Sequence, residues 1–489
     1  MICLITPPSP FLLDERVFPH IGILKIAAVL ESKAIKVDFL DLAGIENYLE
    51  VIEDYLKYSS TTIFGITATT PQLPFAAKIS IKIKELLPNS IIILGGAHVS
   101  LMNSARKAEI KKNLISRASE DIEKLSNLFD VLVAGDGEKA IFDALKIKKG
   151  LIDADEIKSS LFLTDNDLDE LPEPARHLID LNSYHYNIDG NKATSLICQL
   201  GCPFKCAFCG GRNSSFLRRI RTRSSDVVIK EIEELYKKYN YTGFMFYDDE
   251  LNVNKKFEEF LEKLISLQEK VNKKFTFRGF VKAELFTQRQ ADLMYKSGFR
   301  WLLTGFESGD PRILLNIEKQ ATVEDNDRCV SYAKNAGLKV KALMSIGHAG
   351  ESRETIDNTK NWLLKVQPEE FDCTIITTYP GSPYFDNAIF DGEKYIYIAK
   401  KSGDKLYQKS INYEVDLNYY KGDPDGGYVS YVWTDSLTSN DLIVERDLLE
   451  REVREKLKIP FNPGNKLVKY EHSMGQGGIP DSILRSSFS

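Results

Sequence analysis

Three cysteines have the spacing that most clearly predicts chemistry in this sequence. Cys202, Cys206 and Cys209 form a CxxxCxxC pattern. Three thiolates on one loop can bind three irons of a cubane cluster and leave the fourth iron open to an external ligand. A structural zinc site would want four ligands in two pairs, and the second pair is missing, since Cys198 is expected to pack inward from a strand. The pattern predicts a [4Fe-4S] cluster with one open iron; zinc or incidental thiols are the alternatives.

Charged and hydroxyl side chains follow several apolar runs farther along the chain. They are Asp248, Asp249, Glu250, Lys282, Glu284, Glu307 and Ser308. Chemistry in parallel barrels sits at the carboxyl ends of the strands, so these residues are candidates to surround a ligand beside the cysteines. For Asp248 and Asp249 the alternative is a pair of helix N-caps.

The first 150 residues alternate short apolar runs with helical patterns. The runs lie at 2–6, 37–42, 62–67, 90–94 and 131–134. This alternation predicts a doubly wound parallel sheet of Rossmann-like type, which binds ligands beyond the carboxyl ends of its strands. The residues at those ends are Thr67, Gly95, Gly96, His98, Gly135, Gly137 and Glu138. No GxGxxG follows the first strand, so dinucleotide binding has little support.

Three further segments complete the predicted organisation. Residues 151–190 are rich in Asp and Glu and contain Leu-Pro-Glu-Pro at 171–174, which predicts a linker. Residues 191–395 contain about six strand–helix units, which predicts a partial parallel (β/α)6 barrel. Residues 396–489 combine a tyrosine-rich stretch with a charged helix, and we expect a small α+β region that caps the barrel and contributes to the substrate pocket.

Composition excludes several classes of protein. The chain has 489 residues, 64 Lys+Arg against 70 Asp+Glu, and 43% hydrophobic content, which is typical of a globular protein. A net charge of -6 argues against a partner held mainly by phosphate contacts. No run of about 20 uncharged apolar residues is present, and the first residues read as a strand without a basic leader. We therefore expect a cytoplasmic protein without a membrane span or a nucleic-acid partner.

The motifs resemble those of the radical S-adenosylmethionine (SAM) superfamily, and more narrowly the branch with an N-terminal cobalamin-binding domain. The resemblance rests on the cysteine pattern with Phe208, on the GFESG segment at 305–309 and on the PGSP turn at 380–383. It implies that the cysteines hold the cluster, that its open iron chelates SAM, and that reduction yields a 5′-deoxyadenosyl radical. It also implies that the seven polar residues named above surround SAM. His348 replaces the proline of the family's GxPGE turn.

The N-terminal residues resemble the cobalamin module of that branch. The seven residues from Thr67 to Glu138 named above are the implied cobalamin contacts. The DxHxxG motif that supplies a histidine to cobalt is absent, which implies cobalamin without a histidine lower ligand and leaves open a domain that has lost the cofactor. His98 could ligate cobalt, although a histidine at a strand end is more often an ordinary hydrogen-bonding residue.

Three functions are compatible with these motifs. The first is a cobalamin-dependent methyltransferase that acts on an unactivated carbon of a small molecule or natural-product intermediate. The second is a radical SAM cyclase, dehydratase or decarboxylase, with or without bound cobalamin. The third, an iron–sulfur or cobalamin sensor, conflicts with the set of SAM-like motifs. The radical SAM functions require a small-molecule substrate and an external electron donor such as flavodoxin or ferredoxin.

Overall fold

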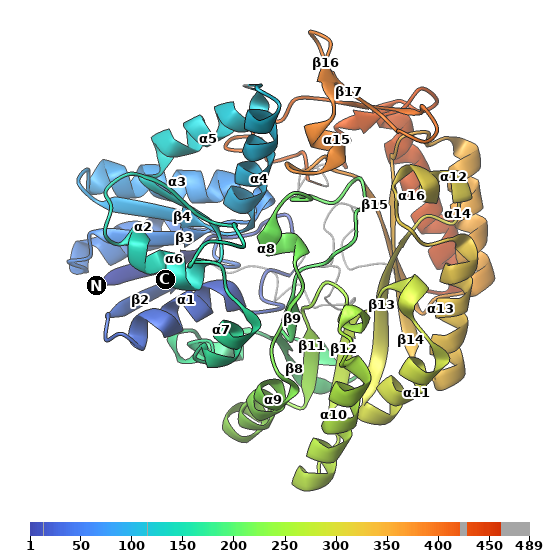
Figure 1. Ribbon diagram of the computed structural model, residues 1–489, viewed down its shortest axis with the longest axis horizontal. Helices are drawn as coiled ribbons and strands as arrows, with labels where there is room; N and C mark the ends of the chain where they lie inside the picture. Colours follow the sequence, from blue (N-terminus) through green and yellow to red (C-terminus); the bar gives the residue numbers. More distant parts are fainter. Residues whose placement is uncertain (13, 115, 421–427, 461–489) are drawn as a thin grey trace.

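Two parallel β-sheets, each covered by helices, form the two main parts of the molecule (Figure 1). The computed structural model describes residues 1–12, 14–114, 116–420 and 428–460. Among these residues, no helix is long and apolar enough to cross a membrane. The α/β class expected from the sequence is confirmed for both parts.

The first sheet has six parallel strands in the order β2-β1-β3-β4-β5-β6. The strands are β1 Ile2–Thr6, β2 Val37–Asp41, β3 Ile63–Thr67, β4 Ile91–Gly95, β5 Val131–Gly135 and β6 Gly150–Ala154. The helices are α1 Ile21–Glu31, α2 Tyr48–Tyr58, α3 Leu73–Leu86, α4 Ala97–Lys111, α5 Arg117–Leu128 and α6 Gly137–Ala144. Side chains alternate across a strand, so Cys3 and Ile5 pack beneath α2–α5 while Ile2 and Leu4 pack beneath α1 and α6.

The second sheet is a partial barrel whose order is β15-β14-β13-β12-β11-β8-β7. Six of its strands run parallel, as the sequence predicts, and β7 adds an antiparallel edge. The strands are β7 Asn187–Ile188, β8 Asn191–Leu196, β11 Gly243–Phe246, β12 Thr276–Phe280, β13 Phe299–Glu307, β14 Lys339–Ile346 and β15 Glu370–Ile375. A separate hairpin pairs β9 Gln199–Leu200 with β10 Arg221–Thr222.

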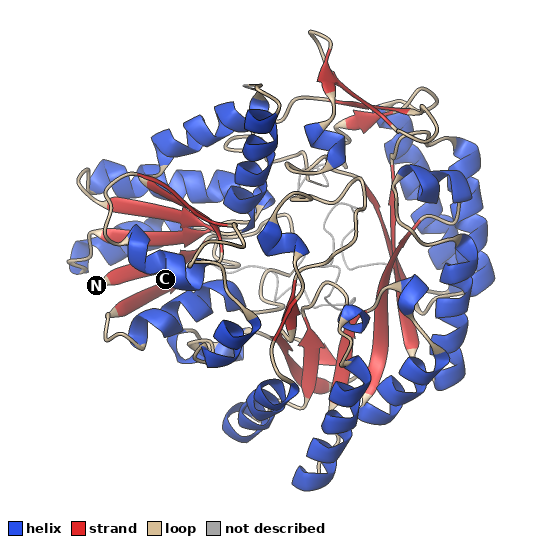
Figure 2. Ribbon diagram, viewed as in Figure 1, coloured by secondary structure: helices blue, strands red, loops and turns tan. Residues whose placement is uncertain are grey.

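Helices cover the outer side of this curved sheet (Figure 2). They are α9 Ser225–Tyr239, α10 Phe257–Val271, α11 Gln288–Ser297, α13 Val323–Ala336 and α14 Arg353–Val366. Three short helices lie in connections: α8 Ser215–Arg218 between β9 and β10, α12 Pro311–Asn316 after β13, and α15 Pro383–Asp386 after β15. Beyond them, a four-stranded antiparallel sheet contains β16 Ile389–Phe390, β17 Tyr395–Ile398, β18 Lys405–Gln408 and β19 Val432–Trp433. The last described helix is α16 Ser439–Leu457.

Helix α16 closes the open edge of the barrel at β15. Glu450 accepts a hydrogen bond from the Cys373 amide at 2.7 Å, and Arg446 donates to the Cys373 carbonyl at 3.0 Å. Arg454 donates to the Phe371 carbonyl at 2.8 Å. An edge strand exposes a row of unpaired backbone groups, so these side chains take the place of a further strand. The described part of the predicted C-terminal cap therefore seals the side of the barrel; its segments 421–427 and 461–489 lie outside the described residues.

The segment predicted as a linker takes part in both sheets. Residues 150–154 form β6, which pairs with β5, and residues 187–188 form β7, which pairs with β8. Between them lies α7 Asp165–Glu170. The first sheet thus extends past the predicted boundary at residue 150, and the antiparallel sheet begins at Ile389, before the predicted start at 396. The acidic composition of 151–190 conceals these strands because each is short and depends on its neighbour for hydrogen bonds.

A buried ion pair joins the two main parts. Asp136 follows β5 and Arg221 lies in β10; their side chains are 1% and 2% exposed, and Arg221 Nη1 lies 2.5 Å from Asp136 Oδ2. Arg221 also donates to the carbonyls of Leu163 at 3.2 Å and Phe216 at 3.1 Å. The guanidinium lies 4.4 Å from the ring of Phe162. Since both charges are removed from water, each depends on the other.

We predict that Arg221→Met destabilises the protein more than Arg221→Met combined with Asp136→Asn. The single change leaves a buried carboxylate without its partner, which costs about 3–5 kcal/mol. The double change removes that unpaired charge and recovers part of the loss. Denaturant unfolding of the wild type, of Arg221→Met and Asp136→Asn singly, and of the double variant gives the coupling free energy. Lys57→Met on the exposed side of α2 is the control. Equal midpoints for the single and double variants would contradict the prediction.

Candidate functional site

The CxxxCxxC loop lies beyond the carboxyl end of β8, the first parallel strand of the barrel. The Cys202 amide donates to the Leu217 carbonyl at 3.0 Å, and the Ala207 amide donates to the Ile317 carbonyl at 2.8 Å. Cys202, Cys206 and Cys209 are partly exposed and form no disulfide, whereas the other four cysteines are buried. The loop is therefore anchored at both ends while its three thiols remain accessible.

The donor set suits a cluster. Within the described ranges, no three His, Cys, Asp or Glu side chains converge on one point as the ligands of a single ion do. Each thiolate of a cubane binds a different iron, so a cluster does not require such convergence. Cys198 packs in the barrel core with Val228 and Ile232, as the sequence predicts.

Cations surround the three thiols. Arg218 Nη2 donates to Cys209 Sγ at 3.1 Å. Burial raises the pKa of Cys202 to about 12, and burial also raises the pKa of Cys206, although Lys319 and Lys282 oppose that rise. Nearby positive charge favours the thiolate form that binds metal. Arg218 was not among the residues singled out from the sequence, because it lies nine positions after Cys209 and only the fold of α8 returns it to the loop.

The acidic residues after β11 divide between two roles. The Asp248 carboxylate accepts hydrogen bonds from the backbone amides of Cys198, at 3.0 Å, and Gln199. Asp248 therefore ties the end of β11 to the segment that leads into the cysteine loop, and it does not cap a helix. Glu250 is partly buried, and burial raises its pKa to about 7 while Lys319 and Lys282 oppose the shift. Asp249 is exposed beside them.

Three buried carboxylate oxygens in this region lack hydrogen-bond donors. Glu250 Oε2 and both carboxylate oxygens of Glu284 accept no hydrogen bond within the part of the chain that the structure describes. Lys282 Nζ lies 3.2 Å from Glu284 Oε1 and donates to the Lys319 carbonyl at 3.1 Å. Unsatisfied buried acceptors carry a free-energy cost unless a ligand donates to them. An amino acid ammonium supplies such donors, so the residues present fit the amino group of SAM.

Glu307 ends β13 in a left-handed backbone conformation, with φ +67°. Its carboxylate lies 3.3 Å from Lys319 Nζ and accepts a hydrogen bond from Ser345 at 2.7 Å. Ser345 lies 2.8 Å from His348 Nε2. Burial lowers the pKa of Lys319, but the nearby Glu307 and Cys206 more than offset that effect and hold the pKa above its usual value. His348, at the place of the family proline, thus joins the network that orients Glu307.

Ser308, the predicted SAM contact next to Glu307, makes its hydrogen bonds within the protein. Ser308 is buried; its hydroxyl lies 3.0 Å from the Thr359 hydroxyl and accepts from the Asp310 amide at 3.0 Å. It shapes the turn after β13. Contact between SAM and any of the seven predicted residues stays a prediction.

We predict that Cys206→Ala abolishes cluster assembly, while Cys198→Ala retains it. Removal of one thiolate leaves an iron without a protein ligand, whereas Cys198 contributes only to the core. Iron content and the visible spectrum after anaerobic reconstitution give the comparison. Full iron content in Cys206→Ala would contradict the assignment of that cysteine.

We predict that Gly305→Ala weakens SAM binding at least about tenfold without loss of iron. A Cβ at Gly305 would lie 2.5 Å from Glu307 Oε1, so the carboxylate must move. Glu307→Gln, which removes charge without crowding, should weaken binding in the same direction. Equilibrium dialysis with labelled SAM measures both, and wild-type affinity in both variants would exclude Glu307 from the SAM site.

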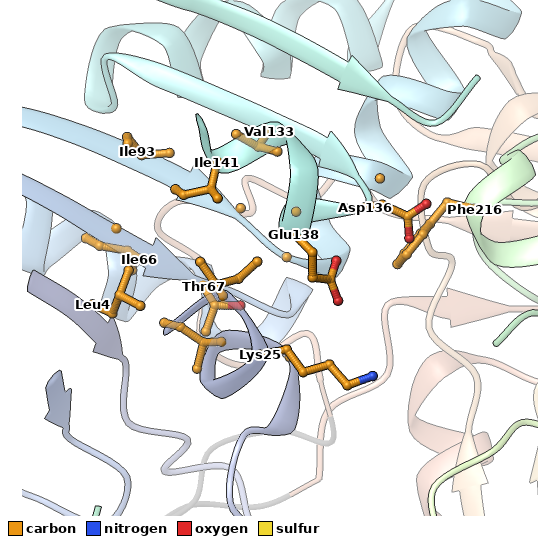
Figure 3. Close-up of a pocket in the computed structure, with 18 of the residues that line it drawn as sticks. Leu4, Lys25, Ile66, Thr67, Ile93, Val133, Asp136, Glu138, Ile141 and Phe216 are labelled. Atoms are coloured by element: carbon orange, nitrogen blue, oxygen red, sulfur yellow. The ribbon is translucent and has the colours of Figure 1, made fainter. Parts of the chain in front are cut away.

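A cavity of about 200 Å³ lies on the α1 and α6 side of the first sheet (Figure 3). Of the predicted cobalamin residues, Thr67, Gly95, Gly96, Gly135, Gly137 and Glu138 line it. A Cβ at Gly22 or Gly95 would meet no atom within 4 Å, so both glycines open onto free space. By contrast, Gly96 is required by the fold, because a Cβ there would lie 2.7 Å from the Ala68 carbonyl oxygen.

Residues of the barrel part complete this cavity. Ile197, Leu200 and Phe216 line it together with apolar side chains of the first sheet. Most of the cavity lining is apolar, and contact between cobalamin and these residues stays a prediction. These three residues were not found from the sequence, since nothing in the barrel sequence indicates that it covers the other domain.

His98 does not line this cavity. It is fully buried; Nδ1 lies 3.2 Å from the Thr70 hydroxyl, and burial lowers its pKa to about 3. Its Nε2 has no hydrogen-bond partner in the described part of the chain. This position suits an ordinary histidine that hydrogen-bonds near a strand end. Ligation of cobalt by His98 stays an untested prediction.

A larger cavity of about 510 Å³ lies between the two parts. Thr6, Ser9 and Thr69 line it from the strand ends of the first sheet, and Gly210, next to Cys209, lines it from the cysteine loop. Six rings also line it: Phe11, Phe18, Tyr184, Tyr247, Tyr379 and Tyr420. The carboxyl ends of both sheets thus open onto one space.

Comparison with known proteins agrees with this architecture. Residues 196–363 match the radical SAM superfamily, and residues 15–111 match the B12 binding domain. The chain is 27% identical to an uncharacterized methyltransferase of Pyrococcus horikoshii, covering 79% of this chain and 83% of the relative. It is 27% identical to the anaerobic magnesium-protoporphyrin IX monomethyl ester cyclase of Cereibacter sphaeroides, covering 80% of this chain and 64% of that enzyme.

Solved structures share the fold. The radical SAM methyltransferase TsrM of Kitasatospora setae aligns with a TM-score of 0.66 at 15% identity, covering 92% of this chain and 90% of that one. The cobalamin-dependent radical SAM enzyme OxsB aligns with a TM-score of 0.55 at 16% identity, covering 76% of this chain and 53% of that one. The protein is a radical SAM enzyme. It belongs to the branch that carries an N-terminal B12-binding domain, a family that uses a [4Fe-4S] cluster, SAM and cobalamin.

Proposed function

We propose that this enzyme is a cobalamin-dependent methyltransferase that acts on an unactivated carbon of a small molecule or natural-product intermediate. The single observation that carries the proposal is the 510 Å³ cavity, which the carboxyl ends of both sheets and the cysteine loop line together. A substrate there would face both cofactors. When bound, the cluster and SAM supply a 5′-deoxyadenosyl radical for hydrogen abstraction, and cobalamin carries the methyl group.

In this proposal the chain's own residues bind, orient and exclude water. Cys202, Cys206 and Cys209 hold the cluster, and Glu250 and Glu284 offer acceptors to the SAM ammonium. Glu307 is oriented by Lys319 and Ser345. The six aromatic rings of the larger cavity favour a substrate with apolar or aromatic surface.

A cyclase, dehydratase or decarboxylase is the second candidate. The observation that favours it is the similarity over 419 residues to the Cereibacter cyclase. Both reactions begin with reductive cleavage of SAM by an external electron donor, so the cluster and SAM sites alone do not separate them.

The test uses the reconstituted full chain under anaerobic conditions with hydroxocobalamin, SAM and titanium(III) citrate. Methyl transfer requires about four irons and one cobalt per chain, formation of 5′-deoxyadenosine, and release of S-adenosylhomocysteine that depends on the corrinoid. The 5′-deoxyadenosine should disappear in Cys206→Ala. Release of 5′-deoxyadenosine without any corrinoid-dependent S-adenosylhomocysteine would replace methyl transfer with the second candidate.

A further inference from the structure

The connection between β1 and α1 reaches from the first sheet into the barrel. Val17 is buried with Met245 of β11 in the cluster on the inner barrel face. The ring of Phe18 meets the rings of Tyr186 and Tyr247 edge-on, with centroids 4.5 and 5.4 Å apart. Residues 14–18 of this connection also line the 510 Å³ cavity, with the exception of Arg16. The connection is therefore a wall of the cavity that is held by the barrel.

The wall of this cavity is aromatic and acidic. Besides its six rings, the carboxylates of Asp14 and Glu15 line it, and no lysine or arginine does so within the described residues. His20 also lines it, and burial lowers the pKa of His20, so this side chain is neutral near neutral pH. Aromatic faces and carboxylates both attract cations. The lining therefore favours a positively charged ligand over an anionic one.

The two carboxylates differ in what they bind within the protein. Glu15 holds the backbone, because it accepts hydrogen bonds from the amides of Ser9 and of Gly44, the second at 2.8 Å. Asp14 is 4% exposed, and its Oδ1 accepts a hydrogen bond from the Arg16 amide at 2.8 Å. No side chain of the described ranges donates to Asp14. Its second oxygen, Oδ2, is thus the acceptor that this wall offers to a ligand.

The cations near Asp14 do not take the place of such a ligand. Arg16 directs its guanidinium to Asp41, 3.5 Å away, and to the Ala43 carbonyl at 2.9 Å. His185 is exposed. Burial raises the pKa of Asp14, whereas the Arg16 amide and the charges of His185 and Arg16 oppose that rise. An ammonium in the cavity would give the buried carboxylate a donor and a matching charge.

We propose that the substrate carries a basic nitrogen on an aromatic or apolar body, and that Asp14 binds this nitrogen as an ammonium group. The inference rests on the proposed function in one respect, namely that the substrate occupies the 510 Å³ cavity. Asp14 is a specificity-determining residue here, since it selects the charge of the substrate. The rings of Tyr247 and Tyr379 offer faces for the apolar body.

The test uses three small probes that share a phenyl ring: phenethylamine, phenethyl alcohol and hydrocinnamate. They carry an ammonium, a neutral hydroxyl and a carboxylate, respectively. Anaerobic equilibrium dialysis of the full-length chain, reconstituted with iron, sulfide and hydroxocobalamin, gives the affinity for each. We expect the amine to bind at least about tenfold more tightly than the other two.

Asp14→Asn removes the charge and retains an oxygen for the Arg16 amide. It should weaken binding of the amine about tenfold and leave binding of the alcohol unchanged. Asp14→Glu, which keeps the charge, should retain the preference for the amine. Asp54→Asn is the matched control, because the Asp54 side chain is 70% exposed on α2, and it should change none of the affinities.

Several results would overturn the inference. They are a wild type that binds none of the probes, a wild type without preference for the amine, and equal weakening of the amine and the alcohol in Asp14→Asn. The last result would make Asp14 a structural residue. The wild-type comparison decides the matter even if Asp14→Asn fails to fold. Corrinoid-dependent release of S-adenosylhomocysteine is measured separately, so methyl transfer can stand where this inference fails.

Discussion

The arrangement of the whole site depends on the contact between Asp136 and Arg221. Parallel strands place reactive groups at their carboxyl ends, so two such sheets can act on one substrate only if those ends face each other. Asp136 follows a strand of the first sheet, and Arg221 lies in the hairpin beside the cysteine loop, with both charges almost fully buried. Because neither charge can leave its partner without a large loss of free energy, this contact holds both cofactor domains around a shared cavity.

Charge is distributed unevenly near the cysteine loop. Lys282 and Lys319 are buried among Glu250, Glu284 and Glu307, yet three carboxylate oxygens of Glu250 and Glu284 accept no hydrogen bond in the described part of the chain. A folded chain tolerates such groups at some expense of stability. The free acceptors suit a ligand that brings an ammonium group.

The secondary contacts show how a few side chains take over backbone roles. Asp248 accepts hydrogen bonds from two backbone amides at the start of the cysteine loop. Glu450 and Arg446 hydrogen-bond to backbone groups at the edge of β15. In both places a strand end or edge would otherwise present unpaired groups to the interior. The sequence predicts Asp248 as a SAM contact and the C-terminal region as part of the substrate pocket. The structure shows that Asp248 and α16 also stabilise the strands that carry the site.

The sequence by itself determined the two parallel sheets, the cysteine motif and six of the residues that line the first cavity, because local periodicity and spacing encode them. It could not reveal β6 and β7 inside a polar segment, since short strands depend on their partners. It also could not reveal Arg218 beside the cysteines, Phe216 in the first cavity, or the closure of the barrel edge by α16. Tertiary structure decided those features, because they join residues far apart in the chain and only packing determines which buried groups become partners.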